Sequence, residues 1–306
     1  MTGLPKEIKD WLTHYNFLLS NAYKNEVFYN PENIREGFAA LTRTLVTEIP
    51  GISMVLDDAI DSGSRPVPVR IYHPDPGHPL PVLLFFHGGG HMVGSVNVYD
   101  PICRKIALAT DRIVVSVDYR LSPEDPYPAG IQDGENVLSG CFGMLDRLRI
   151  KHVPRLAIAG DSAGGAISAT LAHRAQMSEA ARIQHLVLVY PSLDYTLSCP
   201  SVERLSTGYL LEKKRIEWYF DNYFQNKEDR KEASPLFMEI TDSFPETMVI
   251  TAGFCPLCDE GIEYVEKLKA RGIPVQHLHF DGMLHAFLYL EALASSYCKR
   301  LYQEVG

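Results

Sequence analysis

The hexapeptide GDSAGG at Gly160–Gly165 decides how this chain of 306 residues folds. It directly follows the apolar run Leu156–Ala159 and precedes Ala166–Gln176, which has a helical pattern. A G-x-S-x-G motif between a strand and a helix forms a sharp turn that exposes its serine. The flanking glycines leave room for a strained backbone at Ser162, and a helix N-terminus favours negative charge that develops there. The stretch therefore predicts a nucleophilic serine at one edge of an α/β sheet.

Apolar runs and helical patterns alternate along the rest of the chain. The runs lack a period of two, as expected for strands of a parallel sheet that is covered on both faces. They are Val82–Phe86, Ile113–Val117, Leu186–Val189, Met248–Thr251 and Val275–Phe280. The helical stretches are Pro101–Ala109, Ile131–Leu148, Gly261–Ala270 and Ala286–Tyr302, and weaker patterns at Ile52–Leu56 and Val67–Tyr72 predict antiparallel edge strands. The alternation predicts an α/β fold, with a mostly parallel central sheet and helices on both faces.

Two regions interrupt this alternation. Residues 1–45 carry the helical patterns Glu7–Leu19 and Asn33–Leu45, and residues 200–235 contain an amphipathic helix around Trp218 and Tyr219. Extra helices in a protein of this kind commonly form a lid over the open edge of the sheet, where ligands bind. We therefore expect a single domain over residues 1–306, with a helical cap formed by about 1–45 and 200–235.

Composition removes several classes of protein. The chain is 46% hydrophobic, which argues against disorder, and six cysteines are too few for a disulfide scaffold. Its net charge of −9 argues against a nucleic-acid partner, and basic runs such as Lys213–Arg215 are interpreted as solvated helix faces. Residues 1–10 contain charged side chains and do not have the apolar core of a signal peptide. No apolar stretch is long enough to span a membrane. We expect a cytoplasmic protein.

A second glycine-rich stretch, His87–Gly90, follows the apolar run Val82–Phe86. Acyl transfer creates an oxyanion that needs fixed N–H donors, and successive glycines let backbone amides approach a substrate oxygen. The amides of Gly88, Gly89 and Ala163 are predicted to form this oxyanion hole. We expect His87 to brace the loop, and His91, just beyond it, to face the site.

A serine nucleophile also needs a general base. In this type of fold the histidine follows the serine and the acid along the chain. Among the histidines after Ser162, His285 lies in a loop between the last apolar run and the last helical stretch, where a base belongs. We expect His285 to be the base.

These motifs together resemble the hormone-sensitive-lipase-like carboxylesterases of the α/β-hydrolase fold. The resemblance runs from about residue 50 to the C-terminus and includes the stretches His87–Gly90, Asp118–Glu124, Tyr127–Ala129, Gly160–Gly165, Tyr190-Pro191, Gly208–Leu211, Ser234–Leu236 and the His285 loop. It implies a carboxylic-ester hydrolase with a helical cap that acts on short- to medium-chain esters without a cofactor or a metal. A homodimer is a further expectation from the resemblance, and cap residues such as Tyr209, Trp218 and Tyr219 are candidates for lining the substrate pocket.

The chain departs from the family pattern at the triad acid. The family places an aspartate in a stretch like G-x-D-P-L-x-D-E-G, whereas Gly253–Gly261 reads GFCPLCDEG, so Cys255 occupies the acid position. Three interpretations compete: Asp259 or Glu260 reaches His285 instead, Cys255 itself accepts the His285 N–H, or the change is inactivating. Asp281 is a fourth candidate for the acid, although it lies close to His285 along the loop.

The missing acid keeps a second class of function open. A non-catalytic small-molecule-binding protein on the same scaffold would show a damaged triad, although such a receptor has no reason to keep Ser162, His285 and the glycine-rich loop together. Cys255 and Cys258 also form a C-x-x-C pair of the kind found in redox proteins. A zinc site would need a second pair of ligands, which this sequence does not offer.

Overall fold

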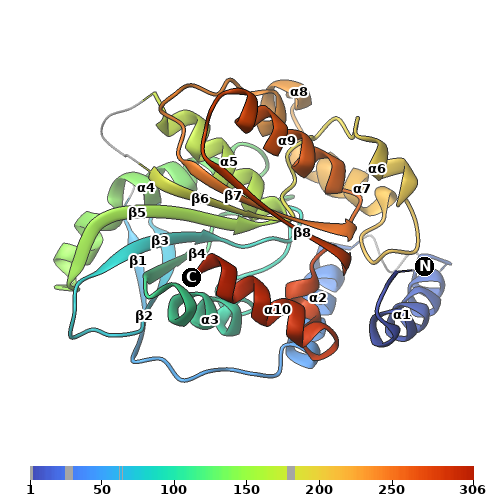
Figure 1. Cartoon of the computed structure of the whole chain (residues 1–306), viewed down its shortest axis with the longest axis horizontal. Helices are drawn as coiled ribbons and strands as arrows, with labels where there is room; N and C mark the ends of the chain where they lie inside the picture. The colour runs from blue at the N-terminus through green and yellow to red at the C-terminus, as the bar shows by residue number, and fades with distance from the viewer. Residues whose placement is uncertain (1–2, 25–29, 62, 64, 178–182) are drawn as a thin grey trace.

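The computed structural model describes residues 3–24, 30–61, 63, 65–177 and 183–306, and its centre is an eight-stranded sheet (Figure 1). The strand order is β1-β2-β4-β3-β5-β6-β7-β8, with β1 and β2 antiparallel to their neighbours and the remaining pairs parallel. The strands are β1 (Met54–Ile60), β2 (Val67–His73), β3 (Leu80–Phe86), β4 (Ile113–Val117), β5 (His152–Asp161), β6 (Ile183–Val189), β7 (Glu246–Phe254) and β8 (Val275–Leu284). The predicted α/β fold with a mostly parallel sheet is confirmed.

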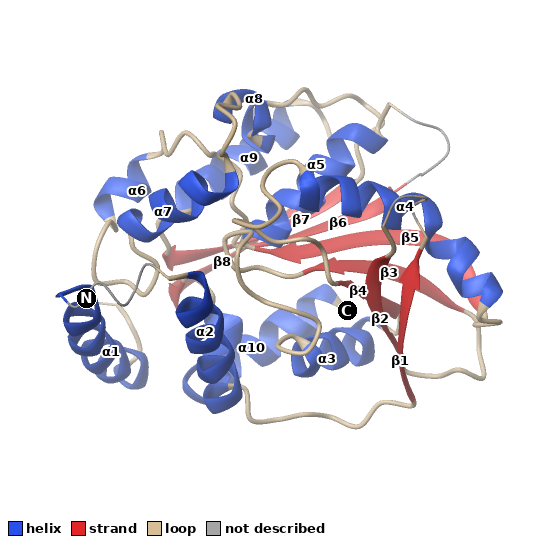
Figure 2. Ribbon diagram, turned by 180° about the vertical axis from the view of Figure 1, so that it is seen from behind, coloured by secondary structure: helices blue, strands red, loops and turns tan. Residues whose placement is uncertain are grey.

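Helices cover both faces of the sheet, with α4, α5 and α9 on one face and α3 and α10 on the other (Figures 1 and 2). The helices are α1 (Lys6–Lys24), α2 (Pro31–Leu45), α3 (Asp100–Thr110), α4 (Ala129–Arg147), α5 (Ala163–Ala175), α6 (Pro200–Arg204), α7 (Lys213–Tyr223), α8 (Arg230–Ala233), α9 (Cys258–Ala270) and α10 (Glu291–Val305). Short 3-10 turns lie at Pro235–Phe237 and Phe287–Leu290. None of the helices among the described residues combines the length and the apolar character that a membrane span requires.

Two hydrophobic cores lie on the two faces of the sheet, and strand β3 contributes to both. Its residues Val82, Leu84 and Phe86 belong to the core under α4, α5 and α9, whereas Leu83 and Phe85 belong to the core under α3 and α10. Successive side chains of a strand point to opposite faces, so a strand that is covered on both sides must be apolar throughout. This is the physical reason for the continuous apolar run that the sequence shows there.

The parallel strands end at one edge of the sheet, and four of them are followed there by a residue of the predicted site or of its supporting loop. His87 follows β3, Ser162 follows β5, Cys255 follows β7 and His285 follows β8. The carboxyl edge of an open parallel sheet is the usual place for a ligand site. The topology therefore brings together residues that lie up to about 200 positions apart.

Helices from the two segments predicted to form a cap lie beyond this edge. Both views place α1, α2, α6 and α7 at the end of the sheet toward which the parallel strands point (Figures 1 and 2). Residues 1–2 and 25–29 of the first segment lie outside the described residues. The division of the chain into a catalytic part and a cap stays a prediction.

Candidate active site

Ser162 sits on the sharp turn between β5 and α5. Its backbone has φ 52° and ψ −118°, a strained conformation for a residue with a side chain. Gly160 and Gly164 make this turn feasible, because a Cβ on Gly164 would overlap the carbonyl oxygen of Phe86 and one on Gly160 would overlap the carbonyl of Gly164. The turn leaves Ser162 only partly buried, at the N-terminus of α5.

A chain of hydrogen bonds connects Ser162, His285 and Cys255. The Oγ of Ser162 lies 3.0 Å from Nε2 of His285. On the other side of the imidazole ring, Nδ1 lies 3.0 Å from Sγ of Cys255. The backbone N–H of Leu257 also donates to this sulfur, at 3.3 Å. The thiol thus occupies the place where a carboxylate would normally orient the histidine.

Burial sets the charge of this pair. It raises the pKa of the Cys255 thiol well above its ordinary value and lowers the pKa of His285 to about 3. The imidazole and the thiol are therefore both neutral at pH 7. A neutral thiol can donate or accept a hydrogen bond, whereas a carboxylate can only accept.

The carboxylates predicted as substitutes for the acid lie elsewhere. Asp259 is paired with the guanidinium of Arg204 at 2.9 Å and 3.2 Å, so the expectation that it orients His285 needs correction. Its place in the first turn of α9 points it toward α6. Glu260 accepts the backbone N–H of Leu193 at 2.6 Å, and Asp281 is 96% exposed beside His279.

The oxyanion hole also needs one correction. The N–H of Gly88 donates to the carboxylate of Asp161 at 2.8 Å, so this amide is not available to a substrate. Gly89 and Gly90 border the cavity together with Ala163, whose N–H belongs to the first turn of α5. The first four N–H groups of a helix have no partner inside the helix. The three candidate amides are therefore those of Gly89, Gly90 and Ala163.

Asp161 is the buried anchor of this arrangement. Besides Gly88, it accepts hydrogen bonds from the hydroxyl groups of Tyr99 at 3.1 Å and Tyr289 at 2.8 Å. Burial raises its pKa to about 8, against an ordinary value of 3.8. Asp161 was not among the predicted site residues, although its position directly before Ser162 in GDSAGG was a signal that could have revealed it.

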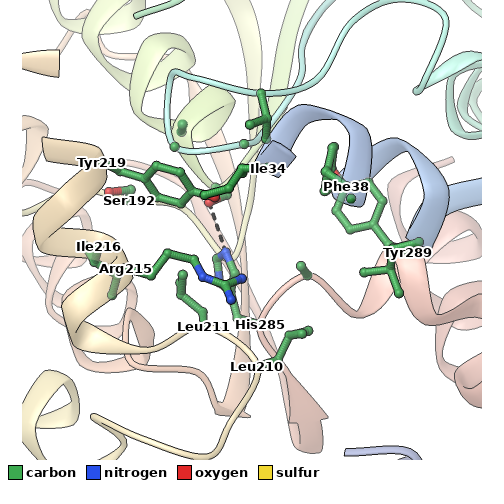
Figure 3. Close-up of a pocket in the computed structure, with 18 of the residues that line it drawn as sticks. Ile34, Phe38, Ser192, Leu210, Leu211, Arg215, Ile216, Tyr219, His285 and Tyr289 are labelled. Atoms are coloured by element: carbon green, nitrogen blue, oxygen red, sulfur yellow. Dashed lines mark hydrogen bonds between the residues drawn. The ribbon is translucent and has the colours of Figure 1, made fainter. Parts of the chain in front are cut away.

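A cavity of about 390 Å³ opens in front of Ser162 and His285 (Figure 3). Helices α1, α2 and α7 contribute to its walls, for example through Leu19, Phe38 and Tyr219. The remaining lining is formed by Tyr15, Leu18, Asn33, Ile34, Gly37, Leu41, Gly89, Gly90, Val93, Asp161, Ala163, Ser192, Leu210, Leu211, Arg215, Ile216, Phe220, Leu257, Ala286 and Tyr289. It is a largely apolar cavity with the candidate nucleophile at its base.

Three residues expected in this pocket lie outside its lining. His91 is buried, stacks on Tyr223 with ring centroids 3.8 Å apart and bonds to Tyr195, and burial lowers its pKa to about 3. Tyr209 stacks on Phe254, and Trp218 packs against Tyr219. Each of these three rings therefore packs against another aromatic ring instead of bordering the cavity.

Comparison with known proteins agrees with this geometry. Residues 83–289 match a family model described as alpha/beta hydrolase fold. Esterase LipI of Mycobacterium tuberculosis is 37% identical over 242 residues, which are 76% of this chain and 75% of that protein. The chain belongs to the hormone-sensitive-lipase-like carboxylesterases of the α/β-hydrolase fold. The predicted enzyme class, a carboxylic ester hydrolase, is confirmed at this level.

Solved structures of α/β hydrolases resemble the whole chain. An esterase from Pyrobaculum calidifontis superimposes with a TM-score of 0.87 over 99% of this chain and 96% of that one, at 29% identity. The relatives of this chain also include a receptor. The gibberellin receptor GID1C of Arabidopsis thaliana is 33% identical over 242 residues, 75% of this chain and 69% of that protein.

Proposed function

We propose that this chain is a serine esterase that hydrolyses short- to medium-chain carboxylic esters through an acyl-enzyme on Ser162. The observation that carries the proposal is the 3.0 Å contact between Ser162 Oγ and His285 Nε2 at the base of the cavity. This is hydrogen-bond distance for a nucleophile and its base. The volume of the cavity, about 390 Å³, lies in the range of small-molecule sites and supports a small ester as substrate.

In the first half of the reaction, Ser162 Oγ attacks the ester carbonyl while His285 Nε2 takes the hydroxyl proton. The negative charge on the carbonyl oxygen is held by the amides of Gly89, Gly90 and Ala163. His285 then passes the proton to the leaving alcohol, and the acyl group stays on Ser162. In the second half, His285 takes a proton from water, which attacks the acyl-enzyme, and then returns that proton to Ser162 Oγ as the acyl–oxygen bond breaks and the acid leaves.

Cys255 limits the rate of this sequence. His285 can act as a base only in the tautomer with its proton on Nδ1, and a carboxylate at the acid position selects that tautomer. A neutral thiol selects it weakly, because S–H can instead donate to Nδ1 and leave the proton on Nε2. It also brings no negative charge to the imidazolium that forms during the reaction. We therefore propose that Cys255 acts as a weak orienting group and that turnover is reduced.

The second candidate function is a non-catalytic binding protein. The thiol in place of the acid favours it, as does the relative that is named a gibberellin receptor. Against it stands the complete set of nucleophile, base and oxyanion amides.

Hydrolysis of p-nitrophenyl butyrate, together with labelling by a fluorophosphonate, separates the two candidates. The esterase proposal predicts slow turnover and covalent labelling of Ser162, both abolished by Ser162→Ala. Ser192→Ala is the matched control, because Ser192 also lines the cavity but takes no part in the proposed reaction. Absence of both turnover and labelling in a folded protein would refute the esterase and favour the receptor.

We also propose a reducing compartment such as the cytoplasm for this protein. The six cysteines are buried free thiols, Cys255 and Cys258 included. Proteins of oxidising compartments tend to use their cysteines in disulfides. Thiol titration of the denatured protein, purified without reductant, tests this assignment.

A further inference from the structure

The face of helix α2 that borders the cavity has a gap in its middle. Ile34, Phe38 and Leu41 line the cavity, and Figure 3 shows the first two with the other lining side chains. Gly37 lies among them, because positions 34, 37, 38 and 41 follow the i, i+3, i+4 and i+7 spacing of one helix face. Gly37 also lines the cavity but has no side chain to fill it. The wall formed by α2 is therefore open at Gly37.

The backbone at Gly37 does not require a glycine. The residue lies inside α2, and its φ is not positive. A Cβ placed on it would have no heavy atom of the described part of the chain within 4 Å. Glycine in the interior of a helix is less favourable than alanine or leucine, so its presence lowers the stability of the helix. What Gly37 provides in return is space beside the cavity.

Other glycines in helices show what a packing role looks like. In α4, a Cβ on Gly134 would lie 2.8 Å from the side chain of Leu171, so this glycine allows a close approach. Gly143, in the same helix, resembles Gly37: it is exposed, and a Cβ there would have no described atom within 4 Å. Gly143 does not line the cavity. It is therefore the matched position for a control.

The gap at Gly37 lies where the cavity opens to solvent. Gly37 is exposed although it lines the cavity, and Leu18 of α1, another lining residue, is 52% exposed. His285 is buried at the base of the cavity, in contact with Ser162. A substrate chain that extends from Ser162 to this opening therefore lies along the α2 face.

We propose that Gly37 sets the length of the hydrocarbon chain that a substrate ester can carry. The side chains around the gap, those of Ile34, Phe38 and Leu41, are apolar, and each buried methylene group of a chain contributes to binding there. With glycine at position 37 the chain continues past α2 toward solvent, whereas a larger residue closes the cavity at this point. The chain can belong to the acyl group or to the alcohol, since both are hydrocarbon. This inference rests on the proposed esterase function.

Two series of esters test it. The p-nitrophenyl esters of acetate, butyrate, hexanoate and octanoate lengthen the acyl chain, and the ethyl, butyl, hexyl and octyl esters of acetate lengthen the alcohol. In Gly37→Leu, the ratio of kcat/KM for the longest to the shortest ester should fall by about tenfold or more in at least one series, because one methylene group in an apolar pocket is worth about that much. The series that responds identifies the chain that passes Gly37. Gly37→Ala, which adds one carbon, should cause a smaller fall in the same series.

Gly143→Leu is the matched control, because it makes the same change at an exposed helical glycine outside the cavity. It should keep the wild-type ratio in both series. Leucine has a higher helix propensity than glycine, so both leucine variants should show an unchanged or higher Tm by circular dichroism. Equal losses at every chain length in Gly37→Leu, ratios that stay unchanged in both series, or the same fall in Gly143→Leu would overturn the inference.

The shortest esters separate this inference from the proposed function. If they are hydrolysed while the ratios do not respond to Gly37→Leu, only the role of Gly37 fails. If no ester is turned over and Ser162 is not labelled, the esterase proposal fails, and calorimetric titration with 1-octanol decides about Gly37. Binding that is weakened in Gly37→Leu then supports the chain site, and binding that is unchanged, or absent in the wild type, refutes it.

Discussion

Replacement of Cys255 by aspartate tests how the base is oriented. In the folded protein the sulfur lies 3.0 Å from His285 Nδ1 and accepts the backbone N–H of Leu257 at 3.3 Å. A carboxylate at this position meets both donors. It fixes the proton of His285 on Nδ1 and places a negative charge beside the imidazolium of the transition state.

The expected gain follows from the contact that changes. A hydrogen bond to a charged group contributes about 1.5–3 kcal/mol, and about 1.4 kcal/mol corresponds to a factor of ten in rate. Cys255→Asp should therefore raise kcat by roughly 10- to 100-fold. The loss of about 10⁴ that follows removal of the charge from a protease triad aspartate sets the upper limit.

Steady-state hydrolysis of p-nitrophenyl butyrate over a range of pH is the assay. His285 must be neutral to act as a base, so activity falls as pH drops through its pKa. In the wild type that pKa is about 3, whereas an ionised aspartate beside the ring raises it. The acidic limb of the profile should move to higher pH in Cys255→Asp.

Cys255→Asn is the matched control, because it has the same shape as the aspartate variant and lacks its charge. It should show neither the gain nor the shift. The reasoning is refuted if the aspartate variant, folded by circular dichroism, is no faster than the wild type or is matched by the asparagine variant.

Three further predictions follow from contacts around the site. Asp259→Asn should change kcat by less than about threefold. It should change stability by about 0–1 kcal/mol, because the partner of Asp259, Arg204, is 55% exposed. A large loss of activity in the same assay would restore Asp259 as the acid. Asp161 has a pKa of about 8 when folded against an ordinary 3.8, so its proton is held more tightly in the folded state and stability falls as pH rises between about 4 and 8. Asp161→Asn should reduce this fall in Tm, and parallel Tm curves for the two proteins would contradict the buried neutral carboxyl. Arg35 donates to the carbonyl oxygens of Met92 and Ser122 and pairs with Glu124, so Arg35→Ala should lower stability by about 1–2 kcal/mol and speed hydrogen exchange in α2, while Arg35→Lys should lose less.

The strands were predictable where both faces are buried. The predicted strand Val82–Phe86 falls within β3, because a short continuous apolar run is typical of a strand that is buried on both faces. The start of β5 was missed because His152–Arg155 is partly exposed and does not form a continuous apolar run, and it joins the sheet through pairing of His152 with Leu80. The helix predicted from Ala286 to Tyr302 is divided into the 3-10 turn Phe287–Leu290 and α10, which begins at Glu291, while Ala286, with a left-handed φ of 61°, lies before both.

The site was predictable to the level of residue type and order. Ser162 and His285 carry distinct motifs, and the structure places them in contact. Three successive glycines look alike in a sequence, and which amide is occupied depends on Asp161, 73 positions away from Gly88. Likewise, spacing alone did not decide between Cys255 and Asp259, because the direction of each side chain depends on where α9 begins.

The loop that bears the amides of Gly89 and Gly90 is held in place by groups that take no part in the proton transfers proposed for Ser162 and His285. Asp161 binds the amide of Gly88, the Tyr119 hydroxyl donates to the carbonyl of His87 at 2.7 Å, and Arg35 reaches Met92. These groups are separate from the two that contact Cys255, which are the imidazole of His285 and the backbone N–H of Leu257. Under the proposed mechanism, recognition of an acyl oxygen and speed of turnover therefore depend on different residues. A single change at the acid position can slow turnover while the ligand-binding pocket stays intact. A ligand-binding receptor can therefore arise from an enzyme of this kind without changes to the pocket.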